Sequence, residues 1–264
     1  MDFSKTLIMG VLNVTPDSFS DGGKFNSIEK AVEHAKKMVE EGADIIDIGG
    51  ESTRPGSEPV SVEEELNRVL PVIKQLSTEI DVPISIDTMK PEVAEECIKA
   101  GAKILNDVTG LQNPRMLEIA AKYNIPTIIM HMKGMPKTMQ ADVEYQDAIA
   151  EIKEFLKTQA QKAKEAGVTQ IIIDPGIGFG KTVEHNLQII KNIQSFKELG
   201  YPVLIGLSRK SFIGKILNAD VHERLEGTLA GVTAAVLNGA NIVRVHDIKE
   251  CRRAVEIARR IRDA

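Results

Sequence analysis

The chain alternates short apolar runs with longer stretches in which apolar residues recur at helical spacing. This alternation is typical of βα units, whose strands form a parallel sheet. The apolar runs cover positions 7–14, 44–48, 84–88, 104–108, 127–132, 171–174, 203–208 and 242–247. The pattern therefore predicts eight strands, each followed by helical structure.

Residue types at the ends of the amphipathic stretches predict where helices begin and end. Ser61 with Glu64 forms a capping-box pattern, and Pro91 suits the first turn of a helix. The first stretch has one apolar stripe, made by Ile28, Ala31, Val32, Ala35, Met38 and Val39. Glycines that can end a helix in the left-handed conformation precede five of the later runs, at Gly42, Gly101, Gly167, Gly200 and Gly239.

Eight such units in 264 residues favour a closed (β/α)8 TIM barrel, which typically needs about 250 residues. No linker or shift in composition divides the chain, so we predict one domain covering residues 1–264. The alternative is an open sheet of six or seven strands, with one run misassigned. In a barrel, the active site lies where the strands end and the following loops begin.

Polar side chains stand at these predicted strand ends. Any one of them could instead cap a helix or form a turn, and Asp47, inside the second run, could be a core carboxylate with satisfied hydrogen bonds. As a set, they carry a desolvation cost that a polar ligand can offset. The set comprises Asn13, Glu51, Thr53, Arg54, Asp87, Asn106, Asp107, His131, Asp174, Ser208, Arg209, Lys210, Arg244 and His246.

The strongest candidates fall into two groups by charge. Acceptors for N–H groups are Asp87, Asn106 and Asp174. Groups that attract anions are Arg54, Lys210, Arg244 and His246. This division predicts a ligand with N–H donors at one end and phosphates or carboxylates at the other. A carboxylate accepts two parallel hydrogen bonds from a guanidine-like edge, which guanine-like and pterin rings display.

Composition excludes several other functions. The net charge of -5 argues against a general nucleic-acid surface. No apolar run approaches the roughly 20 residues that span a bilayer, and the start of the chain is too polar for a secretion signal, so we expect a cytoplasmic protein without a membrane partner. Cys97 and Cys251 lack the spacing of a zinc or disulfide site, and GFGKT at 178–182 does not complete a phosphate-binding loop.

Nine segments along the chain carry a family resemblance. They are LNVTPDSFSDGG, GGESTRPG, DTMKPEVA, NDVTG, MHMKGMPKTMQ, DPGIGFGK, GLSRKSFIG, EGTLA and IVRVHD. In this order they resemble the dihydropteroate synthase family of folate biosynthesis over nearly the whole chain. The resemblance implies condensation of 6-hydroxymethyl-7,8-dihydropterin pyrophosphate with p-aminobenzoate, which releases pyrophosphate and forms 7,8-dihydropteroate.

The resemblance also implies roles for individual residues. The pterin ring would contact Asp87, Asn106, Asp174 and Lys210. The pyrophosphate would contact Asn13, Arg54, Arg244 and His246, with Asn13 also helping to place magnesium. The p-aminobenzoate pocket, in which sulfonamides are expected to compete, would comprise Thr53, Arg54, Pro55, Phe179, Ser208 and Lys210.

From these roles we expect pyrophosphate to leave first and the arylamine to attack the remaining pterin-methylene cation. Arg54, Arg244 and His246 would stabilise the leaving group. The long first loop, residues 15–23, is expected to close over the site, with Phe19 excluding water and Asp21 offering a compensating charge. The alternative for this loop is a surface segment whose Phe19 packs on a neighbouring element.

Two other functions remain open on the sequence. A pterin-dependent methyltransferase shares the barrel and the pterin-facing residues, but has no use for a pyrophosphate clamp. A non-catalytic pterin-binding protein would bind the pterin and release no pyrophosphate. In the family that the chain resembles, a homodimer is the expected assembly.

Overall fold

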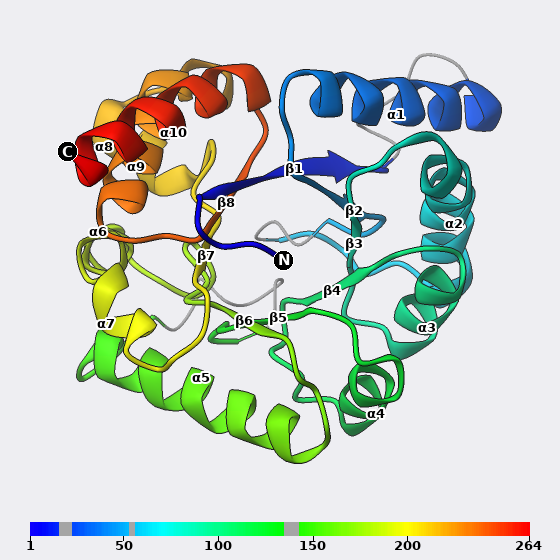
Figure 1. Cartoon of the computed structure of the whole chain (residues 1–264), viewed down its shortest axis with the longest axis horizontal. Helices are drawn as coiled ribbons and strands as arrows, with labels where there is room; N and C mark the ends of the chain where they lie inside the picture. Colours follow the sequence, from blue (N-terminus) through cyan, green and yellow to red (C-terminus); the bar gives the residue numbers. More distant parts are fainter. Residues whose placement is uncertain (16–22, 53–55, 135–142) are drawn as a thin grey trace.

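The computed structural model describes residues 1–15, 23–52, 56–134 and 143–264. Its strands form one parallel sheet in the order β6-β5-β4-β3-β2-β1-β8-β7. Figure 1 shows the strands as a central ring with the helices around it. The strands are β1 (Leu7–Asn13), β2 (Ile45–Gly49), β3 (Ile84–Asp87), β4 (Ile104–Asp107), β5 (Thr127–Met130), β6 (Ile171–Asp174), β7 (Leu204–Ile205) and β8 (Ile242–Val245).

The barrel is nearly closed, with one weak seam. In the described part of the chain, β6 and the strand β7 are joined by one isolated bridge, between Ile173 and Val203. The backbone N–H of Ile173 also donates to the carbonyl of Pro202 at 2.9 Å. The predicted (β/α)8 barrel is thus confirmed, and the open sheet of six or seven strands is not what the chain forms.

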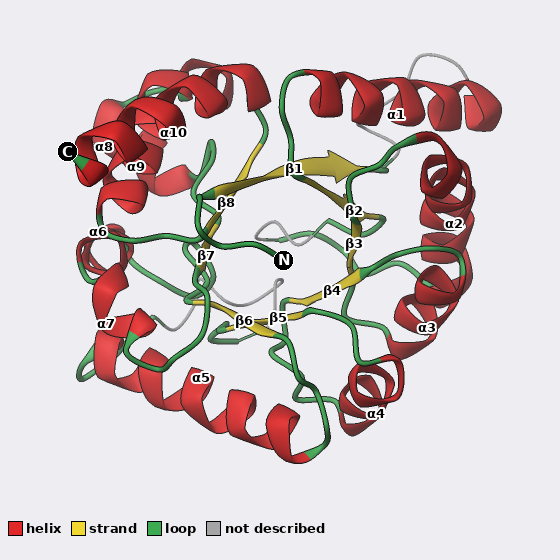
Figure 2. Cartoon of the chain, in the orientation of Figure 1, coloured by secondary structure: helices red, strands yellow, loops and turns green. Residues whose placement is uncertain are grey.

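Helices cover the outside of the ring (Figure 2). Two βα units contain more than one helix, because α7 follows α6 before β7, and α8 with a 3-10 turn at Val221–Glu223 precedes α9. None of the described helices is long and apolar enough to cross a membrane. The helices are α1 (Gly23–Glu40), α2 (Val62–Glu79), α3 (Pro91–Lys99), α4 (Pro114–Tyr123), α5 (Ala148–Glu165), α6 (Val183–Lys191), α7 (Ile193–Lys197), α8 (Ser211–Leu217), α9 (Leu225–Leu237) and α10 (Ile248–Asp263).

The predicted helix signals are confirmed at most positions. The side chain of Ser61 accepts from the backbone N–H of Glu64, whereas the Glu64 carboxylate pairs with Arg68 rather than completing the capping box. Pro91 is the first residue of α3. All five helix-ending glycines have positive φ, from 83° to 126°: Gly42, Gly101, Gly167, Gly200 and Gly239.

Several predicted strands are too long. The run 203–208 contributes a strand of only two residues, Leu204–Ile205, and the run 242–247 ends as strand at Val245. Beyond this short strand the chain turns at Ser208 and Arg209, and Arg209 adopts a φ of 55°. The residues beyond each strand therefore belong to the loops that form the rim of the barrel.

Alternate residues of each strand face the barrel interior. On the even-numbered strands, the lower interior positions are four isoleucines, Ile45, Ile104, Ile172 and Ile242. These four belong to one buried apolar cluster with Leu7, Met9, Ile128 and Leu204. A larger cluster fills the space between the sheet and the helices. The lower barrel is consequently a packed apolar core, as expected for this architecture.

Candidate active site

The interior of the barrel changes from apolar to polar toward the carboxyl ends of the strands. Two residues after each of the four isoleucines, the even-numbered strands carry Asp47, Asn106, Asp174 and Arg244. Because side chains two apart share a face of a strand, these four residues form the next interior layer. This even-strand layer marks the floor of the candidate site.

Ion pairs and hydrogen bonds connect the layer across the barrel. Arg244 donates from Nε to Oδ2 of Asp47 at 2.6 Å and from Nη2 to Oδ2 of Asp87 at 2.8 Å. Asn106 donates from Nδ2 to the same Oδ2 of Asp47 at 3.1 Å. Oδ1 of Asp47 and Oδ1 of Asp87 are buried and have no hydrogen-bond partner among the described residues. The floor therefore has spare acceptors for N–H donors.

Burial governs the protonation of the two predicted pterin carboxylates. It raises the pKa of Asp87 to about 7, with Arg244 opposing the shift and Asp47 adding to it. Burial also raises the pKa of Asp174, while Lys210 and the backbone N–H of Gly176 act in the opposite direction. That N–H donates to Oδ1 of Asp174 at 2.7 Å. Both carboxyls thus favour a ligand that brings hydrogen-bond donors or positive charge.

Lys210 stands at the start of α8, above this floor. Its Nζ donates to the carbonyl of Ile177 and lies 4.7 Å from the centre of the Phe179 ring. Burial lowers the pKa of Lys210 to about 8, although Asp174 holds it up. An amine and an aromatic ring therefore share one side of the rim, as expected for a pocket that binds an aromatic ligand.

Ser208, His246 and Asn13 lie at or after the ends of three neighbouring strands, β7, β8 and β1. Nδ1 of His246 lies 3.0 Å from Oγ of Ser208, and the backbone N–H of His246 donates to the same oxygen at 3.2 Å. Asn13 is the last residue of β1 and is half-buried. Each of these three neighbouring strands therefore contributes one polar group to the rim, and two of these groups, Ser208 and His246, contact each other.

Other predicted rim residues have structural contacts instead. Asp107 is fully buried and accepts from the backbone N–H groups of Thr109 and Leu111, so it orders its own loop. Arg209 forms a two-point ion pair with Asp247. Five predicted site residues lie outside the described part of the chain: Phe19, Asp21, Thr53, Arg54 and Pro55.

The predicted division by charge is not a separation in space. Arg244, an anion-attracting residue by sequence, touches Asp87, which belongs to the acceptor group. Lys210 likewise influences the pKa of Asp174. The two halves of the rim consequently meet in the middle of the barrel, where one small ligand can contact both.

Sequence reasoning missed two residues of this region. The sequence allowed Asp47 to be a core carboxylate with satisfied hydrogen bonds, whereas the structure shows it linking Arg244 with Asn106 through Oδ2 and leaving Oδ1 without a partner among the described residues. Lys181 is buried, and its Nζ lies 3.0 Å from Nδ1 of His131 and donates to the carbonyl of Phe179 at 2.9 Å. Burial lowers the pKa of Lys181 well below its ordinary value, and burial with the nearby Lys181 lowers that of His131 to about 3. The signal for Asp47 was present, because an isoleucine followed two residues later by a polar residue recurs on all four even-numbered strands.

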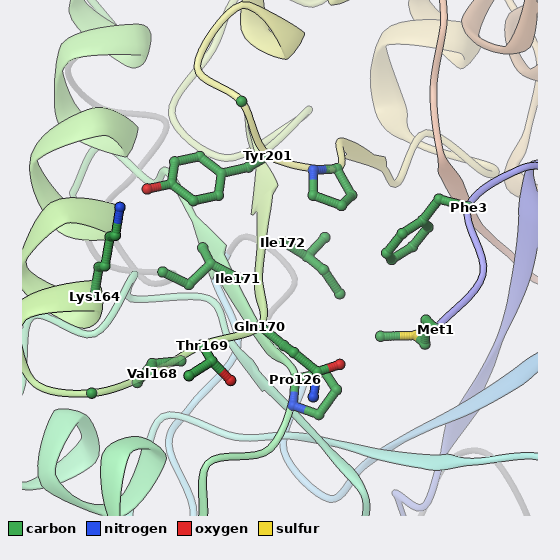
Figure 3. Close-up of a pocket in the computed structure, with 13 residues that line it drawn as sticks. Met1, Phe3, Pro126, Lys164, Val168, Thr169, Gln170, Ile171, Ile172 and Tyr201 are labelled. Carbon is green, nitrogen blue, oxygen red and sulfur yellow. The ribbon is translucent and has the colours of Figure 1, made fainter.

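A cavity of about 570 Å³ lies at the other end of the barrel. Its walls include Pro126, Gln170 and Pro202, which precede β5, β6 and β7, together with Met1 and Phe3 (Figure 3). The strand ends that carry the polar layer face away from it. This cavity is therefore separate from the candidate site.

Comparison with known proteins accounts for this arrangement. A model of the pterin-binding enzyme family matches residues 9–246. A dihydropteroate synthase of Clostridium beijerinckii is 51% identical over 257 residues, which cover 96% of this chain and 93% of that protein. The chain belongs to the dihydropteroate synthase family.

Solved dihydropteroate synthases share its fold. The enzyme of Clostridium difficile, determined in the presence of pteroic acid, is 48% identical, with a TM-score of 0.92 over 98% of this chain and 97% of that one. The Yersinia pestis enzyme, in complex with a sulfonamide drug, is 44% identical, with a TM-score of 0.95 over 100% of this chain and 97% of that one. The family expected from the sequence motifs is confirmed.

Proposed function

We propose that this protein is a dihydropteroate synthase. It joins 6-hydroxymethyl-7,8-dihydropterin pyrophosphate to p-aminobenzoate and releases pyrophosphate, a step of folate biosynthesis. The observation that carries the proposal is a family match over nearly the whole chain, combined with a polar interior layer at the rim where barrel enzymes bind their substrates. Pteroic acid, present with the C. difficile enzyme, contains both halves of the proposed product.

Three acceptors support binding of the pterin ring. Asp87 and Asp174 can each take hydrogen bonds from the guanidine-like edge or ring N–H groups of a pterin. Asn106 offers its carbonyl oxygen, because its amide nitrogen already donates to Asp47. Lys210 supplies a donor for the ring carbonyl. The raised pKa of Asp87, about 7, indicates that this carboxylate gains from a donor-rich ligand.

The proposed pyrophosphate site comprises Asn13, Arg54, Arg244 and His246. Arg244 is held at Nε and Nη2 by carboxylates, so its remaining N–H groups can meet an anion. Nδ1 of His246 faces Ser208, so its other ring nitrogen, Nε2, is the one proposed to meet the pyrophosphate. Together these groups would stabilise the charge that grows on pyrophosphate as it leaves, an effect worth several kcal/mol in comparable sites.

The donor set also fits a magnesium ion shared with the substrate. The described residues contain no cluster of three or more His, Cys, Asp or Glu side chains that could hold a metal by themselves. Magnesium commonly keeps several waters and binds one or two protein oxygens plus substrate phosphates. The amide oxygen of Asn13 would be such a ligand. When bound, the ion adds positive charge at the leaving pyrophosphate.

The proposed p-aminobenzoate pocket comprises Thr53, Arg54, Pro55, Phe179, Ser208 and Lys210. Phe179 and Lys210 offer an apolar ring face beside a cation, which suits an aromatic carboxylate. The sulfonamide bound to the Y. pestis enzyme supports competition at the same pocket here. A sulfonamide is expected to raise the apparent KM for p-aminobenzoate.

The reaction proceeds by cleavage before attack. The bond between the pterin methylene carbon and the bridging oxygen breaks, and its electron pair leaves with pyrophosphate. Asp87 and Asp174 favour the cationic ring that remains. The arylamine nitrogen of p-aminobenzoate then forms the new bond to this carbon and loses a proton to water. No protein nucleophile takes part, because the amine is itself nucleophilic near neutral pH.

Assembly and location complete the proposal. Among the described residues, most of the exposed large apolar side chains belong to α8, α9, α10 and the 3-10 turn between α8 and α9, and they support a homodimer through these neighbouring helices (Figure 1). They are Ile216, Leu217, Val221, Leu237, Ile257 and Ile261. Light scattering of the protein and of an Ile257→Lys variant tests the dimer.

Cys97 and Cys251 are buried free thiols, which fits the reducing cytoplasm and a single packed domain over residues 1–264.

One assay tests the proposed reaction. The purified protein, both substrates and magnesium are mixed, and pyrophosphate and dihydropteroate are measured together. Equal yields of both products are expected. Pterin binding without pyrophosphate release would identify a non-catalytic binding protein instead. Transfer of a methyl group to a corrinoid, in place of both products, would identify a methyltransferase.

The proposed closure of the first loop has its own test. Phe19→Ala and Asp21→Ala are each expected to lower kcat, since one removes a group that excludes water and the other a compensating charge. Unchanged kcat and KM values in both variants would favour a surface segment with no part in catalysis.

A further inference from the structure

Three members of the even-strand layer already have proposed roles toward the substrate, and the fourth does not. Asn106 and Asp174 face the pterin, and Arg244 faces the pyrophosphate. Asp47 completes the layer from β2 and is fully buried, with an exposed fraction of 0%. The parallel register pairs Asp47 with Ser85, so Asp47 lies two residues deeper in the barrel than Asp87.

Asp47 reaches partners on both sides of the barrel. In the sheet order, β2 is separated from β4 by β3 on one side and from β8 by β1 on the other. The same oxygen, Oδ2, accepts from Asn106 at 3.1 Å and from Arg244 at 2.6 Å. One atom therefore joins a pterin residue to a pyrophosphate residue.

These two contacts decide which groups the partners can offer to a ligand. An amide has a donor side and an acceptor side. With Nδ2 of Asn106 turned to Asp47, Oδ1 is left as the acceptor for a pterin N–H group. Arg244 has Nε on Asp47 and Nη2 on Asp87, so its guanidinium plane is fixed at two points.

Stability alone does not account for a carboxylate at this position. Burying a charge is costly, and a buried ion pair is often no more stable than well-packed apolar residues of similar volume. Oδ1 of Asp47 adds to the cost, since it is buried with no hydrogen-bond partner in the described part of the chain. The arrangement is better explained by what Asp47 does to its two partners.

We propose that Asp47 is a positioning residue for the pterin pyrophosphate substrate, acting through the amide of Asn106 and the guanidinium of Arg244. It holds both groups in the binding orientation before the substrate arrives. Such preorganisation lowers the cost of ordering the site on binding. This inference rests on the proposed function, and it concerns the pterin and pyrophosphate halves of the site, not the p-aminobenzoate pocket.

The test compares two substitutions that each neutralise one buried carboxylate of the central sheet. Asp47→Asn keeps the shape of the side chain and removes its charge. Asp107→Asn is the matched control, because Asp107 is equally buried but lies on the helix-facing side of β4, where it orders its own loop. Thermal unfolding is measured for both variants, so that losses of fold are separated from losses of binding.

Asp47→Asn is expected to raise the KM for pterin pyrophosphate by about tenfold, the effect of losing a hydrogen bond to a charged group. Its KM for p-aminobenzoate should stay close to that of the wild type. Calorimetry with 6-hydroxymethylpterin alone and with inorganic pyrophosphate alone should show weaker binding of both. Asp107→Asn should lower the melting temperature and leave both dissociation constants unchanged.

A double-mutant cycle with Arg244→Lys examines the route of the effect. If Asp47 acts through Arg244, Asp47→Asn should weaken pyrophosphate binding less in the Arg244→Lys background than in the wild type. The loss of 6-hydroxymethylpterin binding should persist, because it passes through Asn106. Additive losses of pyrophosphate affinity would overturn the proposed route.

Wild-type affinity of a folded Asp47→Asn variant for both probes would overturn the inference. The inference would also be overturned if both variants, Asp47→Asn and Asp107→Asn, raised the KM for pterin pyrophosphate and the KM for p-aminobenzoate by the same factor. Such a result would indicate a general structural effect. Should Asp47→Asn not fold, Asp47→Ser is measured in the same way with the same expectations. A wild-type protein that binds both probes but yields no dihydropteroate would contradict the proposed function and leave the inference to be decided by the binding data.

Discussion

Nη2 of Arg244, on β8, lies 2.8 Å from Oδ2 of Asp87, on β3. Two strands, β1 and β2, separate β8 from β3 in the sheet, so the ion pair crosses the barrel interior. A residue proposed to bind pyrophosphate is thereby tied to one proposed to bind the pterin. The charge of each group shifts the pKa of the other.

Arg244→Ala should lower kcat/KM for pterin pyrophosphate by about 100-fold or more, the usual cost of removing one group that stabilises a developing negative charge. It also leaves Asp47 and Asp87 without their shared cation, so thermal stability should fall. Steady-state kinetics and thermal unfolding measure the two effects. Arg259→Ala is the control, because Arg259 pairs with Glu256 on the surface of α10 and should change neither quantity greatly. Unchanged turnover in Arg244→Ala would contradict the assignment.

The pH dependence of kcat/KM for pterin pyrophosphate should be bell-shaped. Asp87 accepts N–H bonds best when ionised, so activity should rise with pH as its pKa of about 7 is passed. Lys210 acts as a cation, so activity should fall as pH passes its pKa of about 8. These two limbs report the free enzyme.

Lys210→Arg offers a check on the alkaline limb. Arginine stays charged throughout this range, so the fall above pH 8 should move to higher pH even if the rate is lower overall. A wild-type profile that is flat across both pKa values would count against the proposed protonation states.

Lys181→Met should raise the KM for p-aminobenzoate several-fold and leave the KM for pterin pyrophosphate nearly unchanged. The reason is that Nζ of Lys181 holds the carbonyl of Phe179, whose ring faces Lys210. Lys191→Met, on the exposed side of α6, serves as the control for loss of a lysine. Equal increases in both KM values would indicate that Lys181 supports the whole barrel rim rather than this pocket.

Gly176→Ala should destabilise the protein far more than Gly167→Ala. Both glycines have positive φ, 71° and 103°, which costs an L-residue about 1–2 kcal/mol. At Gly167 an added Cβ meets nothing within 4 Å, whereas at Gly176 it would lie 1.9 Å from the carbonyl oxygen of His131. Denaturant titration of the two variants compares the backbone cost alone with that cost plus a steric overlap. Similar free energies of unfolding would show that the loop can move away.

The barrel was predictable from the sequence because its signals are local. A helix that ends at a glycine such as Gly101, before an apolar run such as 104–108, needs no information from the rest of the chain. The length of the seventh strand was not predictable in this way. Residues 203–208 are apolar enough for a longer strand, but only Leu204–Ile205 pair regularly before the chain turns at Arg209.

The sequence predicted which strand-end residues form the site. It did not predict the hydrogen bonds and ion pairs between them. Asp87 and Arg244 were both expected at the rim, but their contact depends on the width of the barrel and on which residues face inward. For Asp47 a core position stayed an open alternative, because a single carboxylate in an apolar run gives no sign of what lies opposite it. The repeated pattern of isoleucine and polar residue on alternate strands becomes informative only when the strands are compared with each other.

The weak seam between β6 and β7 implies that the substrate also stabilises the barrel. The backbone joins these two strands at only one isolated bridge within the described residues, and Asp174 ends one strand while Lys210 follows the other. If the pterin binds both side chains as proposed, it would span the pair of neighbouring strands that share the fewest backbone contacts. The bound ligand would then link β6 to β7 where few backbone hydrogen bonds do so. Amides flanking Ile173 and Val203 would exchange with solvent more slowly once the pterin is bound.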